Sequence, residues 1–138
     1  MKLHARIISC AFLLLASPPV FSELATDVWF VVSGGLWQKS YTEHGNFRVI
    51  VKNEGWEHTR SLLYLQWLKA DDQKKEIRVL EETAVSEFNN GGWFHVMNVE
   101  LKDNAFLIAY VERGKEDLPR LAELRPAKPG IYRFVVKK

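Results

Sequence analysis

Apolar and polar residues alternate along most of the chain after residue 27, and this period of two restricts the fold more than any other feature. Successive side chains of a β-strand point to opposite faces, so the alternation predicts strands with one buried face. In the segment NFRVIVKN, Phe47, Val49 and Val51 fall on one face, and Arg48 and Lys52 on the other. We predict about seven strands, within residues 27–32, 46–53, 61–69, 74–82, 92–102, 104–114 and 130–138.

Segments rich in glycine, asparagine and aspartate separate these runs, as expected for turns. We predict hairpin turns at residues 53–55 and 102–104, a charged loop at 70–75 and a turn at 89–92. The segment KEDLPRLAELRP differs, because Leu118, Leu121 and Leu124 recur every three residues and Pro119 suits a first helical turn. We therefore predict one short helix near residues 118–124.

Many short strands joined by short turns in one domain indicate an antiparallel β-sandwich, with a small β-barrel as the alternative. Two segments resemble parts of immunoglobulin-like sandwiches. LQWLKADDQ resembles the strand that carries the core tryptophan, and KPGIYRFVV resembles the strand that carries a tyrosine corner. The resemblance implies an immunoglobulin-like or related sandwich that lacks the usual cysteine pair.

The first 22 residues have the order of a secretory signal peptide. Lys2 and Arg6 precede an apolar run at residues 7–16, and Val20 and Ser22 are small enough for a cleavage site. The run is shorter than the roughly 20 residues that span a bilayer. We therefore expect cleavage near Ser22, a periplasmic or secreted domain over residues 23–138, and no stable membrane insertion of the mature chain.

Removal of the signal changes the charge and the cysteine content. It takes Lys2 and Arg6 from the 19 basic residues and no acid, which leaves 17 bases against 17 acids. A neutral domain with interspersed charges gives no electrostatic reason to expect nucleic-acid binding. Removal of the signal also takes away Cys10, the single cysteine of the chain, so the mature domain is expected to have no disulfide and no thiol nucleophile.

The aromatic residues are the best candidates for ligand contact. Trp67 alternates with leucines and is expected in the core, and Trp29 and Trp93 are expected to pack within strands. Trp37 follows two glycines and leads into a polar segment that contains Tyr41, whereas Trp56 follows a turn glycine. Exposed aromatics at strand ends can stack on sugars or anchor a protein partner, although such residues more often cover the end of a core.

Histidines form the second group of candidates. His44 and His58 flank one predicted hairpin, which suggests that they lie in the same region of space, and Glu57 precedes His58. Neighbouring residues of a strand point to opposite faces, so Glu57 and His58 are not expected to bind one metal ion together. We predict ordinary loop or strand-end histidines rather than a metal site, with His95 as the further histidine to consider.

No catalytic constellation is recognisable in the sequence. It has no G-x-S-x-G nucleophile segment, and its paired acids, such as Asp71-Asp72, are consecutive rather than placed across a site. We predict a non-enzymatic binding module for a protein or peptide of the cell envelope, without a cofactor, with Trp37, Tyr41, His44, Trp56 and His58 as ligand-contacting residues. The first alternative is a glycan-binding module that uses strand-end aromatics. The second is a metal-binding or hydrolytic domain that uses His44, Glu57 and His58.

Overall fold

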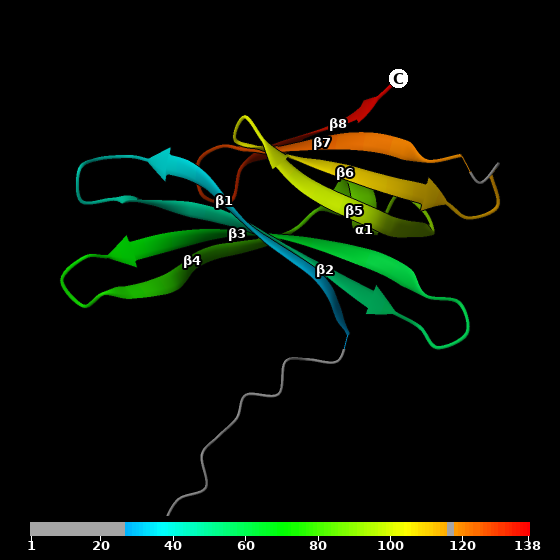
Figure 1. The fold of residues 1–138 in the computed structure, drawn as a ribbon, viewed down its shortest axis with the longest axis horizontal. Helices are drawn as coiled ribbons and strands as arrows, with labels where there is room; N and C mark the ends of the chain where they lie inside the picture. The colour runs from blue at the N-terminus through cyan, green and yellow to red at the C-terminus, as the bar shows by residue number, and fades with distance from the viewer. Residues whose placement is uncertain (1–26, 116–117) are drawn as a thin grey trace, which may run out of the picture.

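The computed structural model describes residues 27–115 and 118–138, and within them the chain forms two four-stranded antiparallel sheets (Figure 1). Sheet A has the order β1-β2-β3-β4, and sheet B the order β5-β6-β7-β8. The elements are β1 (Val28–Gln38), β2 (His44–Glu54), β3 (Arg60–Asp71), β4 (Glu76–Ala84), α1 (Ser86–Asn89), β5 (Phe94–Lys102), β6 (Ala105–Glu112), β7 (Arg120–Pro126) and β8 (Tyr132–Lys137). The predicted β-sandwich is confirmed, and the described strands do not close into a barrel.

The core lies between the sheets and follows the predicted alternation. On β2 and β3 the pairs Phe47–Trp67, Val49–Leu65 and Val51–Leu63 face inward, and each of these side chains is at most 3% exposed. Sheet B contributes buried side chains from three of its strands, among them Val96, Val99, Phe106, Ile108, Tyr110, Ala122 and Leu124. β3 is buried on both faces over residues 65–68, and its outward-facing Leu62 and Tyr64 are half-buried, as expected for a central strand that is apolar on both faces.

The prediction of a short helix near residues 118–124 is wrong. Residues 120–126 form β7, which pairs with β6 and β8. Ala122 and Leu124 are fully buried at a spacing of two, while Leu118 and Leu121 are exposed, so the threefold leucine spacing does not mark a buried helical face. β7 also raises the strand count to eight. The α-helix of the described residues is the four-residue α1, whose Phe88 is buried in the core.

The turn chemistry was predicted better. Asp103 and Asn104 have φ of 50° and 57° and join the paired residues Lys102 and Ala105, as a two-residue hairpin of type I′ requires. The β2–β3 hairpin, predicted to turn at residues 53–55, reverses later. Glu54 pairs with Arg60, so the loop comprises residues 55–59. Gly55 has the expected positive φ of 100°.

The strand order differs from that of immunoglobulin domains, in which strands of the two sheets interleave along the sequence. Here each sheet is a meander of consecutive strands. Tyr132, the candidate for a tyrosine corner, instead donates its hydroxyl to Glu87 at 2.7 Å and accepts from the Ser86 amide. It therefore ties β8 to α1 rather than to its own preceding backbone.

The predicted signal peptide over residues 1–22 lies outside the described residues. Within the described ranges, no helix has the length and apolar character needed to cross a membrane.

Candidate ligand-binding cleft

The meander divides the loops between two ends of the sandwich (Figure 1). One end, which we call the cleft end, carries the β1–β2, β3–β4, β5–β6 and β7–β8 loops. The other, the α1 end, carries α1 and the β2–β3 and β6–β7 loops. This division decides which of the predicted site residues can act together.

The structure does not bring His44 and His58 together. His44 begins β2, whereas His58 lies in the loop that follows it. Because a strand advances about 3.3 Å per residue, the 11 residues of β2 place the two histidines at opposite ends of the sandwich. The expectation that they share one region is therefore wrong. Trp37, Tyr41 and His44 belong to the cleft end.

Trp37 is a buried residue and not the exposed strand-end aromatic that the sequence suggested. Its side chain is 8% exposed, and its indole Nε1 donates to the Leu68 carbonyl oxygen at 3.0 Å. Tyr41 and Trp56 are instead 95% and 97% exposed. Tyr41 lies in the β1–β2 loop and Trp56 in the β2–β3 loop, so these two aromatics do not form one platform.

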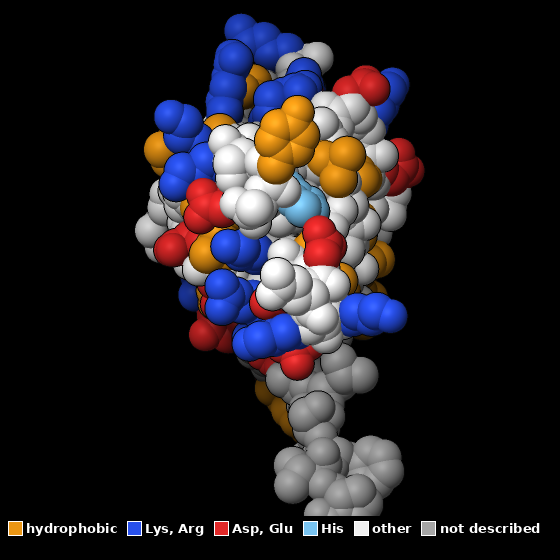
Figure 2. Space-filling view, turned by 90° about the vertical axis from the view of Figure 1, so that its left-hand side faces the viewer, with side chains coloured by type: hydrophobic (Ala, Val, Ile, Leu, Met, Phe, Trp, Pro, Cys, Tyr) orange, Lys and Arg blue, Asp and Glu red, His pale blue; other side chains and the backbone are white. Residues whose placement is uncertain are grey.

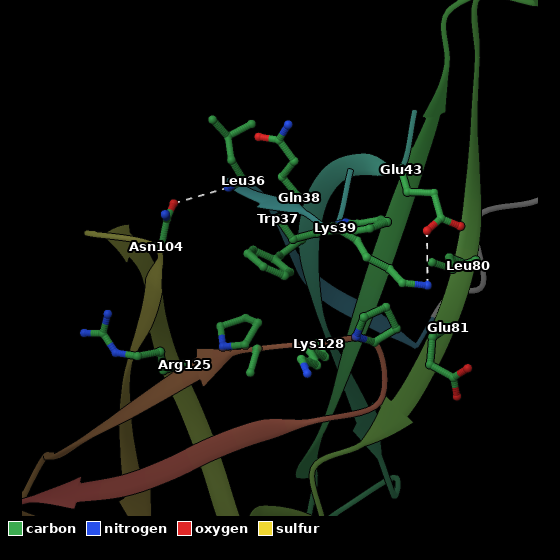
Figure 3. Close-up of a pocket in the computed structure, with 14 residues that line it drawn as sticks. Leu36, Trp37, Gln38, Lys39, Glu43, Leu80, Glu81, Asn104, Arg125 and Lys128 are labelled. Carbon is green, nitrogen blue, oxygen red and sulfur yellow. Dashed lines mark hydrogen bonds and ion pairs between the residues drawn. The ribbon is translucent and has the colours of Figure 1, made fainter. Parts of the chain in front are cut away.

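A cleft of about 920 Å³ opens between the sheets at the cleft end (Figure 3). Figure 3 shows Trp37 between Leu36 and Arg125, with Leu80 and Glu81 of β4 across the opening. The cleft is lined by Leu36, Trp37, Gln38, Lys39, Glu43, Phe47, Leu80, Glu81, Asn104, Arg125, Pro126, Ala127, Lys128 and Pro129. Its floor is aromatic and apolar, and its rim carries charges of both signs.

The local sequence explains why β1 enters the cleft as it does. The β1–β2 register shifts between Gly34 and Trp37, which is a bulge at the two glycines that precede Trp37. Gly35 has φ +70°, which favours glycine, and a Cβ atom there would lie 2.9 Å from the Phe47 ring. Asn104 Oδ1 accepts from the Leu36 amide at 3.2 Å, which ties β1 to the β5–β6 turn.

The β7–β8 loop forms the opposite wall. The Ala127 amide donates to the Ile131 carbonyl at 2.8 Å, and the Ile131 amide to that of Lys128 at 2.8 Å. The Trp67 indole donates to the Ala127 carbonyl at 3.0 Å, so a core tryptophan of sheet A holds this loop of sheet B. Pro126 and Pro129 restrict the backbone further, because proline fixes φ.

The charges on the rim are only partly neutralised by their neighbours. Lys39 pairs with Glu43 at 3.2 Å, and Arg125 pairs with Glu123 at 3.0 Å. Hydrogen bonds from Lys137 and then Arg125 to Glu123 lower the pKa of that carboxyl. Glu81 and Lys128 make no ion pair with any described residue. The surface at this end shows Lys/Arg, Asp/Glu and hydrophobic side chains interspersed (Figure 2).

The α1 end is filled. His58 Nδ1 lies 2.9 Å from Arg113 Nη2 and accepts a hydrogen bond from it, while the Trp93 indole donates to the Thr59 carbonyl at 3.2 Å. The Arg60 guanidinium lies 5.9 Å from the centre of the Trp93 ring. The adjoining backbone is held by a buried bond from the Val96 amide to the Ser61 hydroxyl at 2.9 Å.

The described residues do not form a metal site. The His44 imidazole has one carboxylate near it, with Nε2 at 3.8 Å from Asp72 Oδ2, while Nδ1 lies 3.2 Å from the Tyr41 carbonyl oxygen. Within the ranges 27–115 and 118–138, no three His, Cys, Asp or Glu side chains lie together in a group that could hold a metal ion. A zinc ion needs three or four convergent ligands, so this geometry gives the metal hypothesis no support.

The sequence suggested only part of the cleft. Trp37 was among the candidates, but Phe47, Leu80 and the β7–β8 wall were not. Pro126 and Pro129, close together before the last strand, were the available signal for a stiff loop. Comparison of the chain with family models, with curated proteins and with solved structures gave no match.

Proposed function

We propose that this protein is an exported, non-enzymatic binding module that holds an apolar segment of a partner polypeptide of the cell envelope in the cleft. The cleft carries this proposal: its aromatic floor offers apolar burial, and its rim offers charges of both signs for the polar parts of a peptide. Among the described residues, its lining includes no histidine, serine, threonine, tyrosine or cysteine, so it offers no hydroxyl, thiol or imidazole for nucleophilic catalysis.

Selection from a displayed random-peptide library tests the proposal. We expect peptides with apolar cores to be enriched on the immobilised domain. Leu36→Asp, at a cleft residue that is 71% exposed, should weaken their binding by about tenfold or more. Leu118→Asp is the matched control, because Leu118 is 64% exposed and lies outside the cleft. A library that yields no binders, or binders equally sensitive to both variants, contradicts the proposal.

The export part of the proposal is supported by the sequence of residues 1–22 alone. Expression of the full chain followed by intact-mass measurement of the purified protein should give a mature chain that begins near Glu23. A retained N-terminus contradicts export by this route.

Glycan binding is a second candidate, and the exposure of Trp56 favours it. A tryptophan that is 97% exposed on a hairpin loop presents its ring face for stacking on a sugar. Envelope polysaccharide should then quench tryptophan fluorescence in the parent protein and not in Trp56→Ala. Equal quenching in both proteins, or none in either, removes this candidate.

A further inference from the structure

β4 is the most exposed of the four edge strands. Each of its residues from Glu76 to Glu82 is exposed, and β4 contains neither proline nor lysine. β1 lies against β5, and β8 packs Tyr132 and Phe134 against the core, so these edges are partly covered. In Figure 1 the β3–β4 hairpin extends beyond sheet B. An edge strand presents unpaired backbone donors and acceptors, which can pair with another chain.

Two hollows reach β4 from opposite faces of sheet A. The cleft includes Leu80 and Glu81 on the inner side. A second depression of about 400 Å³, which we call the outer hollow, includes Ile77 and Val79. The outer hollow is lined by Ser33, Gly34, Asn46, Arg48, Leu68, Ile77 and Val79. On β1 it is bordered by the small side chain of Ser33 and by the backbone of Gly34.

We propose that the partner segment adds to sheet A as a fifth strand on the free edge of β4, with alternate side chains directed into the cleft and into the outer hollow. This inference rests on the proposed binding function and specifies its mode. Successive side chains of an added strand point to opposite faces, as the two hollows require. Backbone pairing then supplies affinity, and the alternate pockets supply specificity.

Charge identifies the kind of strand that fits. β4 carries Glu76, Glu81 and Glu82 against the single base Arg78, and none of these four side chains forms an ion pair with a described residue. A second copy of the same strand would carry the same excess of three acids over one base, and this shared negative charge disfavours self-pairing. The partner is therefore an extended segment with an apolar centre and lysine or arginine on both flanks.

A synthetic peptide with blocked ends and the sequence Lys-Lys-Val-Leu-Val-Leu-Val-Lys-Lys is the probe. It should bind the unaltered domain, measured by isothermal titration, and raise hydrogen-exchange protection of residues 76–84. Two derivatives then test backbone pairing, one N-methylated at the three valines and the other at the two leucines. One derivative should lose about tenfold or more in affinity while the other stays within about threefold, because only alternate amides face the edge.

Equal losses in the two derivatives overturn strand addition, whereas the library selection above still tests the binding function. Absence of any binding by the parent peptide overturns the basic apolar strand as the occupant. A concentration-dependent dimer that Val79→Asp dissociates also overturns it, in favour of a second copy.

Variants of the protein test the two hollows separately. Leu80→Asp in the cleft and Val79→Asp in the outer hollow should each weaken peptide binding about tenfold. Val136→Asp is the control, because Val136 lies on edge strand β8 and is 47% exposed against 45% for Val79. Circular dichroism establishes that each variant is folded. If Leu80→Asp alone has an effect, the ligand uses the cleft without adding a strand.

Discussion

Both ends of the sandwich carry hairpin loops, and one end also carries α1, but the two ends differ in what fills the space between the sheets. At the α1 end, Phe88 enters this space and packs on Phe94 and Tyr110, with ring centroids 4.8 and 5.4 Å away. At the cleft end, no equivalent side chain of the described residues closes the opening lined by Trp37 and Phe47. The same sandwich thus has one end built for stability and one end left accessible.

The comparison teaches that aromatic content does not identify a binding site here. At the α1 end, three aromatic rings pack around Phe88, and the Trp93 indole bonds to the Thr59 backbone of the opposite sheet. The cleft end exposes an apolar floor and leaves Lys128 and Glu81 on its rim without described ionic partners. Unfilled volume with free rim charges is the feature that distinguishes the candidate site.

Phe88→Ala should have the largest effect on stability, because it removes the side chain that fills the α1 end and so removes the difference between the two ends. Phe88 is 1% exposed, so we expect a loss of about 3–5 kcal/mol in the free energy of unfolding, measured by urea denaturation. Phe88→Leu should lose clearly less, since it keeps much of the volume. A loss below about 1 kcal/mol for Phe88→Ala would mean that the α1 end is not sealed by this residue.

Asn89→Ala tests the polar seal beside Phe88. The Asn89 side chain accepts from the Leu63 amide at 2.7 Å and donates to the Leu63 carbonyl at 3.1 Å. The Leu63 carbonyl also accepts from Val85, so the amide alone loses its partner, and we expect a loss of about 1–3 kcal/mol.

Asn104→Gly is the matched change at the cleft end, because glycine keeps the positive φ of 57° that alanine would strain. It removes a bond to the exposed Leu36 amide, which water can replace, so the expected loss by urea denaturation is about 0.5 kcal/mol. Equal losses in Asn89→Ala and Asn104→Gly would contradict the difference between the two ends.

The layered architecture was predictable because it follows from side-chain alternation, which depends on local geometry. Val49, Val51, Leu63 and Leu65 are buried as predicted. The 118–124 segment was mispredicted because its leucines fit a period of three, while pairing with β6 and β8 selected the period of two shown by Ala122 and Leu124. Tertiary pairing overrode the local pattern.

The cleft was less predictable because its walls are distant in sequence. Trp37, Leu80 and Pro129 come together only when sheet B folds onto sheet A, which no local period encodes. The error with His44 and His58 had a different origin. A hairpin brings together residues at equal distances from its turn, and these two residues lie at unequal distances.

Tyr132→Phe probes a weaker contact at the α1 end and should have a pH-dependent effect. Burial raises the pKa of Glu87, but hydrogen bonds from Tyr132, from the Glu87 amide and from Ser86 outweigh it and lower that pKa below its ordinary value of 4.5. The carboxylate therefore contributes stability above that value and loses the contribution as the pH falls through the lowered pKa.

The expected cost of Tyr132→Phe near neutral pH is about 0.5–1 kcal/mol, because Glu87 is largely exposed. The difference between the urea midpoints of the variant and the parent should narrow as the pH falls through the lowered pKa of Glu87. A cost that is constant with pH would show that Glu87 is not the partner responsible.

Trp56→Ala should have the smallest effect on stability, although Trp56 belongs to the end with the denser packing. Its side chain is 97% exposed, so removal should change the free energy of unfolding by no more than about 0.5 kcal/mol. Trp37→Ala, at 8% exposed and hydrogen-bonded to Leu68, is the contrasting change and should cost about 3–5 kcal/mol in the same urea measurement. Together the two tryptophans separate packing from exposure: the one that supports the cleft is needed for folding, and the one on the β2–β3 loop is free to serve a ligand. A comparable loss in both variants would mean that Trp56 packs against the domain in solution, and it would remove the ground for a glycan platform on that loop.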